Sequence, residues 1–246
     1  MKIHQFVRIG EHHENHCEDS VLSTSIGSHS VLLAVMDGCT MGDDSYFASK
    51  LIANLLKKIG RECFYKEYLK SEMLHLNDQL KQICKRLFEE LVFLKNHLQL
   101  EINELLSTVV LGVVDIEKRA AEIIVIGDGV LVYNDEIIEY DQDNVPDYIG
   151  YHLNANFEEW YERQEQRLSL EAITQLSLST DGIFTFSKYD QKSYPEKSVE
   201  EIINYLLIEV ADLDNERMLL KKIIKIEKEW GLKATDDLGI VSLRLV

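Results

Sequence analysis

Proline, glycine and long apolar runs are all scarce in this sequence. Only 2 prolines and 12 glycines occur among 246 residues, which leaves almost nothing from which to build a flexible linker between domains. We therefore expect residues 1–246 to form a single domain. The longest uninterrupted apolar stretch lies around residues 108–114, far below the ~18 residues that a membrane-spanning helix requires. The sequence thus predicts no membrane partner.

Cysteine is scarce as well, and no secretory signal is evident. The four cysteines, at positions 17, 39, 63 and 84, are too few in a chain of this length for the disulfide framework of a secreted protein. The first five residues contain no apolar run of the kind that a secretory signal carries. We therefore expect a cytoplasmic protein in a reducing environment.

Basic residues are outnumbered by acidic ones. The chain has 26 Lys and Arg against 43 Asp and Glu, which gives a formal net charge of −17. A field of this sign repels the phosphates of nucleic acids and the surfaces of anionic membranes. We therefore expect no nucleic-acid partner. Hydrophobic residues at 46% and charged residues at 28% are typical of a globular protein with a sizeable core.

Apolar residues recur with two different spacings, which predict strands and helices along the chain. The predicted strands are a hairpin over residues 22–36 with its turn at 27–30, followed by 105–115, 121–126, 130–133, 175–180 and 238–245. The predicted helices are 45–59, a longer one whose apolar stripe runs from Leu69 through Met73 to Leu94, then 199–210 and 215–230. This order predicts an α+β fold with helices packed on sheet faces.

Three segments carry more specific expectations. The consecutive strands between residues 105 and 133 predict a meander. The polar segment 141–167 has no clear period, so we expect a surface loop with some helix. The long helical stripe is more typical of a core element than of a coiled coil in a chain so rich in strands, although it leaves dimerisation open.

Five predicted strand ends each carry an acidic residue: Glu18, Asp37, Asp128, Asp181 and Asp236. Turn formation by Asp-Gly explains one or two of these acids, but not all of them. If the strand ends meet in the fold, two carboxylates at ~4 Å repel each other by ~4 kcal/mol at an effective dielectric constant near 20. Oxygen ligands select hard cations. The pattern therefore predicts a site for Mn²⁺ or Mg²⁺.

Six short motifs also occur in order along the chain. They are Glu18-Asp19-Ser20, Val35-Met36-Asp37-Gly38, Ser107-Thr108, Ile126-Gly127-Asp128-Gly129, Ser179-Thr180-Asp181-Gly182 and Asp236-Asp237-Leu238-Gly239-Ile240-Val241. Together they resemble the motifs of the metal-dependent serine/threonine protein phosphatases, the protein phosphatase 2C family, in a divergent, bacterial-like form. The resemblance covers nearly the whole chain. It implies a four-layer αββα sandwich, in which two antiparallel sheets are flanked by pairs of helices.

The resemblance also implies roles for individual residues. Asp37 matches the aspartate that bridges two metal ions, and Gly38 matches the residue that offers its backbone carbonyl. Asp181 and Asp236 match ligands of the first ion. Two further acids match outer positions: Glu18 lies near the second ion, and Asp128 matches a residue that holds a third ion in bacterial members. We expect Asp37, Asp181 and Asp236 to be the catalytic residues.

The activity implied by the resemblance is hydrolysis of phosphoserine and phosphothreonine on proteins by a metal-activated water, without a phosphoenzyme. The cofactors would be two Mn²⁺ or Mg²⁺ ions, with a third at Asp128. The partners would be a phosphoprotein substrate and a cognate serine/threonine kinase. Two alternatives stay open, namely a catalytically weak or inactive phosphatase-like module for binding or regulation, and a phosphatase of small phosphoesters.

Two departures from the family pattern support the first alternative. Glu14 stands where the family usually places an arginine that grips phosphate, and Cys39 stands where many eukaryotic members carry a histidine. A thiol with a reference pKa of ~8.5 is a poorer proton donor at neutral pH than an imidazolium of ~6.5. The substrate-side candidates are therefore Glu14, His16 and Cys39, with His12 or His13 as other sources of a positive group.

Histidines and cysteines near the first motif suggest zinc as a further alternative, because imidazole and thiolate are zinc ligands. The residues concerned are His12, His13, His16, Cys17 and Cys39. Their spacing does not match that of a structural zinc site. Polar histidines in an approach loop and two small buried thiols are the simpler interpretation.

Overall fold

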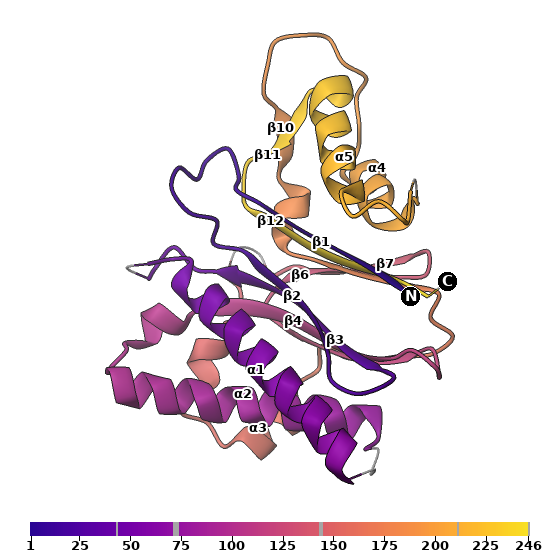
Figure 1. The fold of residues 1–246 in the computed structure, drawn as a ribbon. Helices are drawn as coiled ribbons and strands as arrows, with labels where there is room; N and C mark the ends of the chain where they lie inside the picture. The colour runs from indigo at the N-terminus through magenta and orange to yellow at the C-terminus, as the bar shows by residue number, and fades with distance from the viewer. Residues whose placement is uncertain (43, 71–73, 143–144, 211, 246) are drawn as a thin grey trace.

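Two antiparallel five-stranded sheets lie face to face between two layers of helices (Figure 1). This arrangement is seen in a computed structural model that describes residues 1–246 except 43, 71–73, 143–144, 211 and 246. The predicted α+β class and the four-layer αββα sandwich are confirmed. In the described part of the chain, no helix is both long enough and apolar enough to cross a membrane.

The two sheets are built from different parts of the chain. The first sheet has the order β2 (Ser20–Ser25), β3 (Ser30–Gly38), β4 (Ser107–Asp115), β5 (Ala120–Ile126) and β8 (Arg167–Leu170). The second sheet has the order β1 (Lys2–Arg8), β12 (Leu238–Arg244), β9 (Gln175–Ser179), β6 (Gly129–Tyr133) and β7 (Glu136–Tyr140). A small two-stranded antiparallel sheet of β10 (Phe186–Lys188) and β11 (Leu232–Ala234) stands apart.

Helices cover the outer face of each sheet (Figure 1). Helices α1 (Phe47–Lys70), α2 (Leu76–Leu98) and α3 (Phe157–Arg163) lie on the first sheet, and α4 (Val199–Ile203) and α5 (Met218–Lys225) lie on the second. Helices α4 and α5 continue as π-helical turns, Asn204–Ile208 and Ile226–Trp230. Short 3₁₀ turns cover Ile102–Leu105, Ile149–His152 and Asp181–Phe184.

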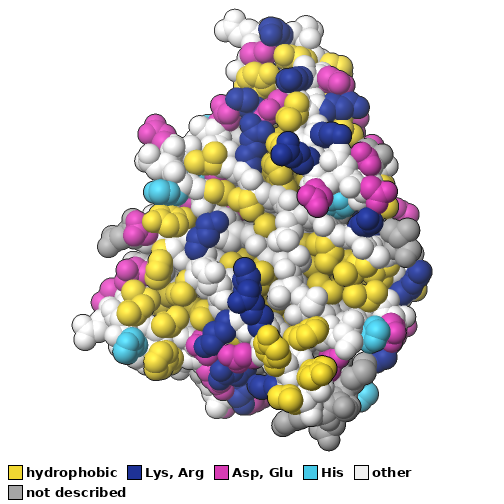
Figure 2. All heavy atoms as spheres, viewed as in Figure 1, with side chains coloured by type: hydrophobic (Ala, Val, Ile, Leu, Met, Phe, Trp, Pro, Cys, Tyr) yellow, Lys and Arg dark blue, Asp and Glu magenta, His cyan; other side chains and the backbone are white. Residues whose placement is uncertain are grey.

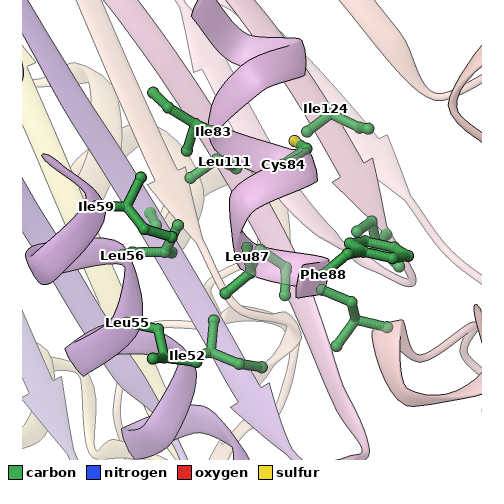
Figure 3. Packing of buried hydrophobic residues seen from close by; sticks show 14 of the residues in the cluster. Ile52, Leu55, Leu56, Ile59, Ile83, Cys84, Leu87, Phe88, Leu111 and Ile124 are labelled. Atoms are coloured by element: carbon green, nitrogen blue, oxygen red, sulfur yellow. The ribbon is translucent and has the colours of Figure 1, made fainter. Parts of the chain in front are cut away.

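The uninterrupted apolar run of β3 is explained by burial on both of its faces. Leu32 and Met36 pack under α1 and α2, whereas Leu33 and Val35 pack against the second sheet. Figure 3 shows the outer layer, where α1 and α2 interdigitate over β4. Because side chains alternate along a strand, Asp37 continues the series that faces the space between the sheets.

The boundary predicted between the first two helices is wrong. Leu69 belongs to α1 and is 78% exposed, and α2 begins only at Leu76. Met73 lies outside the described residues. The apolar spacing continues across the connection although Leu69 and Leu74 are exposed, and neither proline nor glycine marks the break.

The predicted meander is also wrong. Strands β4 and β5 pair in the first sheet, but β6 pairs with β9 and β7 in the second. The chain crosses between the sheets at Gly127 and Gly129, which have positive φ angles of 90° and 144°. Residues other than glycine rarely adopt these angles, so the short Gly-Asp-Gly segment is a crossing and not a hairpin turn.

The segment 141–167 is less superficial than expected. It contains α3, as the predicted partial helix requires, but Ile149, Trp160 and Tyr161 are buried. The Trp160 ring lies 4.4 Å from the ring of Phe88 on α2. Aromatic packing therefore fixes α3 against α2, and the expectation of a surface loop is corrected for this part of the segment.

Candidate active site

Acidic residues from both sheets converge at one edge of the space between them. Asp37 ends β3, Asp128 lies in the crossing between the sheets, Asp181 opens the 3₁₀ turn after β9, and Asp236 precedes β12. The charge of Asp181 acts on Asp37, and the charges of Asp128 and Asp236 act on Asp181. Together with Asp19 we call these residues the carboxylate cluster.

Asp19 forms the buried centre of the carboxylate cluster, although sequence reasoning did not select it. It is 1% exposed, and its Oδ2 accepts a hydrogen bond of 2.6 Å from Thr180 Oγ1. Its Oδ1 has no hydrogen-bond donor among the described residues, and its side chain interacts with the Asp37 carboxyl group. Burial raises the pKa of Asp19 to about 8, and burial together with the Asp19 charge raises the pKa of Asp37 well above its usual range.

The pKa values of other carboxyl groups in the site are raised as well. Burial, with the charges of Asp128 and Asp236, raises the pKa of Asp181 to about 7. Burial raises the pKa of Asp128 and of Glu18 as well. The shared upward shift comes first from burial and then from the charges of neighbouring acids, both of which disfavour the ionised carboxylates. A bound cation would compensate this charge.

Asp237 holds the loop before β2 against β12. Like Asp19, it is a residue whose role sequence reasoning missed. It is 2% exposed, and its carboxylate accepts hydrogen bonds from the Gly10 amide at 2.7 Å and from the Glu18 amide. Asp19 and Asp237 are each the second acid of an acidic pair. That pairing is the signal that could have found them.

His13 is the histidine that contacts this acidic region. Its Nδ1 lies 3.0 Å from Asp237 Oδ2, and its Nε2 lies 3.5 Å from Asp236 Oδ1. Burial lowers the pKa of His13, but the hydrogen bond of Asp237 and the charges of Asp237, Glu18 and Asp236 together outweigh burial, so that the pKa is raised. His13 thus supplies some of the missing positive charge.

A polar pocket of about 280 Å³ opens beside the site. Its lining comes from the loop before β2 and from the segment before α1: His12, His13, Glu14, Asn15, His16, Glu18, Asp44, Ser45 and Tyr46. Glu14 and His16, two of the substrate-side candidates, therefore line the same pocket as Glu18. The His16 ring packs on Tyr46 with a centroid distance of 4.4 Å.

Gly38 and Cys39 lie deeper than the pocket. The Gly38 amide donates a hydrogen bond of 3.3 Å to the Glu18 carbonyl, and a Cβ at Gly38 would lie 3.1 Å from that same oxygen. Cys39 is 7% exposed and contacts the hydroxyl of Tyr148. The structure therefore separates Cys39 from Glu14 and His16, the other two substrate-side candidates.

The chemistry of the donors fits hard divalent cations better than zinc. The ligand candidates are carboxylates and one carbonyl, and the Asp19 Oδ1 is a buried oxygen without a donor. All four cysteines are free, and burial raises the pKa of the Cys17 thiol, which disfavours a thiolate. Across the residues that the structure describes, no three His, Cys, Asp or Glu side chains stand in the arrangement of a formed metal site.

The fold and the site together define a class of protein: an αββα sandwich with a carboxylate cluster where its two sheets meet. Residues 9–218 match the family described as protein phosphatase 2C. The chain belongs to this family, and its phosphatase fold supports a phosphatase function. No curated protein matches the sequence.

Solved structures share the fold at low sequence identity. A mutant of a bacterial serine phosphatase has a TM-score of 0.66 and 16% identity, over 100% of this chain and 99% of that chain. The serine/threonine phosphatase Stp1 from Staphylococcus aureus has a TM-score of 0.62 and 16% identity, over 100% and 96%. The phosphatase domain of SpoIIE from Bacillus subtilis, solved with a fragment of its regulatory domain, has 0.58 and 17%, over 99% and 63%.

Proposed function

We propose that this protein is a metal-dependent phosphatase that hydrolyses phosphoserine and phosphothreonine on proteins. The observation that carries the proposal is the carboxylate cluster, in which buried carboxyl groups from both sheets raise one another's pKa values and divalent cations would neutralise their charge. The proposed metal-binding residues are Glu18, Asp37, Gly38, Asp128, Asp181 and Asp236, with Asp37, Asp181 and Asp236 central to catalysis. Family membership supports the reaction class.

Divalent cations bound at the site would lower the pKa of a water and make it a nucleophile toward phosphorus. The protein's own residues prepare the site in three ways. Thr180 and Asp19 hold the buried side of the carboxylate cluster through their 2.6 Å hydrogen bond. Asp237 fixes Glu18 and the loop before it. The pocket beside Glu18 offers room for the residues that flank a phosphorylated side chain.

Phosphate release from a panel of phosphoserine and phosphothreonine peptides tests the proposal. We expect release with Mn²⁺ or Mg²⁺, loss of release with excess chelator, and recovery when the ion is restored. Preference for free phosphomonoesters over phosphopeptides would instead indicate a phosphatase of small phosphoesters. Absence of release from every substrate, with metal bound, would contradict a catalytic role.

One observation favours a second candidate, a non-catalytic binding or regulatory module. Glu14 lines the pocket where a phosphate-gripping arginine would be expected, and its charge opposes phosphate capture. A module of this kind would bind phosphopeptides in calorimetry without releasing phosphate. We further propose a cytoplasmic location, a single domain over the whole chain, and a cognate serine/threonine kinase that phosphorylates the substrate.

A further inference from the structure

A tyrosine from the segment 141–167 reaches the carboxylate cluster. The hydroxyl of Tyr148 lies close to the thiol of Cys39, and the charges of Asp37 and Asp128 act on it. Tyr148 lies immediately before the 3₁₀ turn Ile149–His152 and is half-buried. None of the six sequence motifs includes it.

The backbone independently fixes Tyr148 beside Cys39. The amide of Cys39 donates a hydrogen bond of 3.3 Å to the carbonyl of Leu106. The 3₁₀ turn packs on the preceding residue, because a Cβ added at Gly150 would lie 2.7 Å from the Leu105 carbonyl oxygen. One short stretch of chain therefore supports both Cys39 and the turn that follows Tyr148.

The other side of Tyr148 is fixed to the crossing between the sheets. A Cβ added at Gly127 would lie 2.6 Å from the carbonyl oxygen of Asp147 and 2.8 Å from Cγ2 of Thr108. Thr108 is the β4 residue opposite Asp37. The residue before Tyr148 therefore packs on Gly127, the neighbour of Asp128, and Gly127 in turn packs on the strand residue that pairs with Asp37.

Side-chain contacts hold this part of the chain in place. Gln166 Nε2 donates a hydrogen bond of 2.9 Å to the Gly127 carbonyl, and its Oε1 lies 3.4 Å from the Gln142 amide nitrogen. The His152 Nε2 lies 2.7 Å from Asp147 Oδ2. Tyr148 is thus held on a supported segment, in a position suited to a defined contact.

We propose that the Tyr148 hydroxyl donates a hydrogen bond to the phosphoryl group of the substrate beside Asp37. This inference rests on the proposed phosphatase function. A dianionic phosphoryl group needs donors, and carboxylates such as Asp37, Asp128 and Glu14 supply none when ionised. A phenol donates without adding negative charge. Burial and the Cys39 contact raise the pKa of Tyr148, so that the hydroxyl keeps its proton.

The test compares Tyr148→Phe with Tyr151→Phe as a matched control. Tyr151 is 50% exposed, and the centroid of its ring lies 5.6 Å from that of Tyr148, so the control removes the same hydroxyl group from a neighbouring, more exposed tyrosine. A hydrogen bond to a charged group accounts for a factor of about ten to a hundred. We expect Tyr148→Phe to lower kcat/KM for a phosphopeptide by such a factor, and Tyr151→Phe to leave it unchanged.

Calorimetry provides a second readout that a merely structural role would not move. Inorganic phosphate is titrated into each Mn²⁺-loaded protein, and Mn²⁺ is titrated into each metal-free protein. We expect Tyr148→Phe to weaken phosphate binding about as much as kcat/KM, with unchanged Mn²⁺ affinity. Unchanged phosphate affinity, weakened Mn²⁺ binding, or no phosphate binding by the wild type would overturn the inference. Phosphate binding without any turnover by the wild type would sink the proposed function alone.

Discussion

Asp37 lies against the buried carboxyl group of Asp19, and this contact determines how removing the Asp37 charge affects stability. We predict that Asp37→Asn abolishes Mn²⁺ binding and activity together. The metal-free variant should be as stable as the metal-free wild type or more stable, because the repulsion with Asp19 is relieved. A ligand at 100 times its dissociation constant stabilises a protein by ~2.7 kcal/mol, and the variant should lose this gain in thermal melts.

The exposed Asp78 in the first turn of α2 offers a control for this change. Asp78→Asn should keep the full stabilisation by Mn²⁺. An Asp37→Asn protein whose melting temperature still rises with Mn²⁺ would remove Asp37 from the metal-binding set.

Glu14 offers a second prediction at the scale of single residues. Because Glu14 lines the pocket beside Glu18, Glu14→Arg should lower KM for a phosphopeptide about tenfold to a hundredfold through a charge-assisted contact. The effect on kcat should be smaller, since the contact serves ground state and transition state alike. Steady-state kinetics on the metal-loaded enzyme measure both constants.

Glu11→Arg is the matched control, because Glu11 lies in the same loop, pairs with Lys233 at 2.6 Å and does not line the pocket. Glu11→Arg changes the net charge of the protein by the same amount as Glu14→Arg. Equal effects of the two variants would point to long-range attraction, and an unchanged KM in Glu14→Arg would show that Glu14 does not face the phosphate.

Sequence reasoning at the residue scale could find the acids that end predicted strands, because a strand pattern followed by Asp-Gly is visible locally. It could not find Tyr148, since the segment around it has no period and no motif. The partners of Asp19 and Asp237 were equally hidden. The Thr180–Asp19 and Gly10–Asp237 hydrogen bonds join residues 161 and 227 positions apart, and only the assembled sheets bring them together.

At the scale of elements, the π-helical end of α4 depends on a buried lysine. Lys222 of α5 is 2% exposed, and its Nζ donates hydrogen bonds to the carbonyls of Tyr205, Leu206 and Glu209. Lys222→Met should lower the stability by about 2 to 4 kcal/mol, because buried carbonyls would lose their donor. Chemical denaturation measures the loss.

The neighbouring Lys221 is exposed, so Lys221→Met should change the stability by less than about 0.5 kcal/mol. If both substitutions were equally mild, water would be replacing the Lys222 ammonium at the helix end. That result would contradict the structural role of the buried charge.

Element prediction succeeded where one face of a helix or both faces of a strand are buried, as in α2 and β3. It failed where the position of a strand depends on the strand with which it pairs. Strand β1 alternates polar and apolar residues weakly, and its place in the sheet comes from pairing with β12. The direction of the chain after β5 is likewise set by which sheet receives β6, and the local sequence does not encode that choice.

At the scale of the whole molecule, the metal-free protein should lose stability as pH rises. The pKa values of Asp19 and Asp181 are raised from 3.8 to about 8 and about 7 in the folded state. Between about pH 4 and pH 8 the folded chain therefore holds protons that the unfolded chain has released, and its free energy of unfolding falls. The melting temperature should fall by roughly 10 to 25 °C from pH 5 to pH 8.

Saturating Mn²⁺ should flatten this dependence, because bound cations favour the ionised carboxylates. The metal-free Asp37→Asn variant should also show a flatter profile, which separates the site from the rest of the acidic chain. A metal-free melting temperature that rises over the same pH range would contradict the raised pKa values.

The negative net charge is not spread evenly over the molecule. Figure 2 shows Lys and Arg side chains gathered over the part of the surface where α5 lies, with Asp and Glu among them. Several acids are instead concentrated within the carboxylate cluster, where Asp19 is buried. Bound cations would neutralise charge at one point, so their effect on stability should exceed that of the same ionic strength supplied by a monovalent salt.

The pairing of β1 with β12 has a practical consequence for attaching other molecules. Lys2 lies opposite Arg244, and the marked ends of the chain lie side by side in Figure 1. At the other end of the same strands, Arg8 lies opposite Leu238, which directly follows Asp236 and Asp237 in the sequence. Seven residues of strand span roughly 20 Å. A fluorophore, an affinity handle or an immobilising surface joined to either terminus would therefore leave the approach to the carboxylates open.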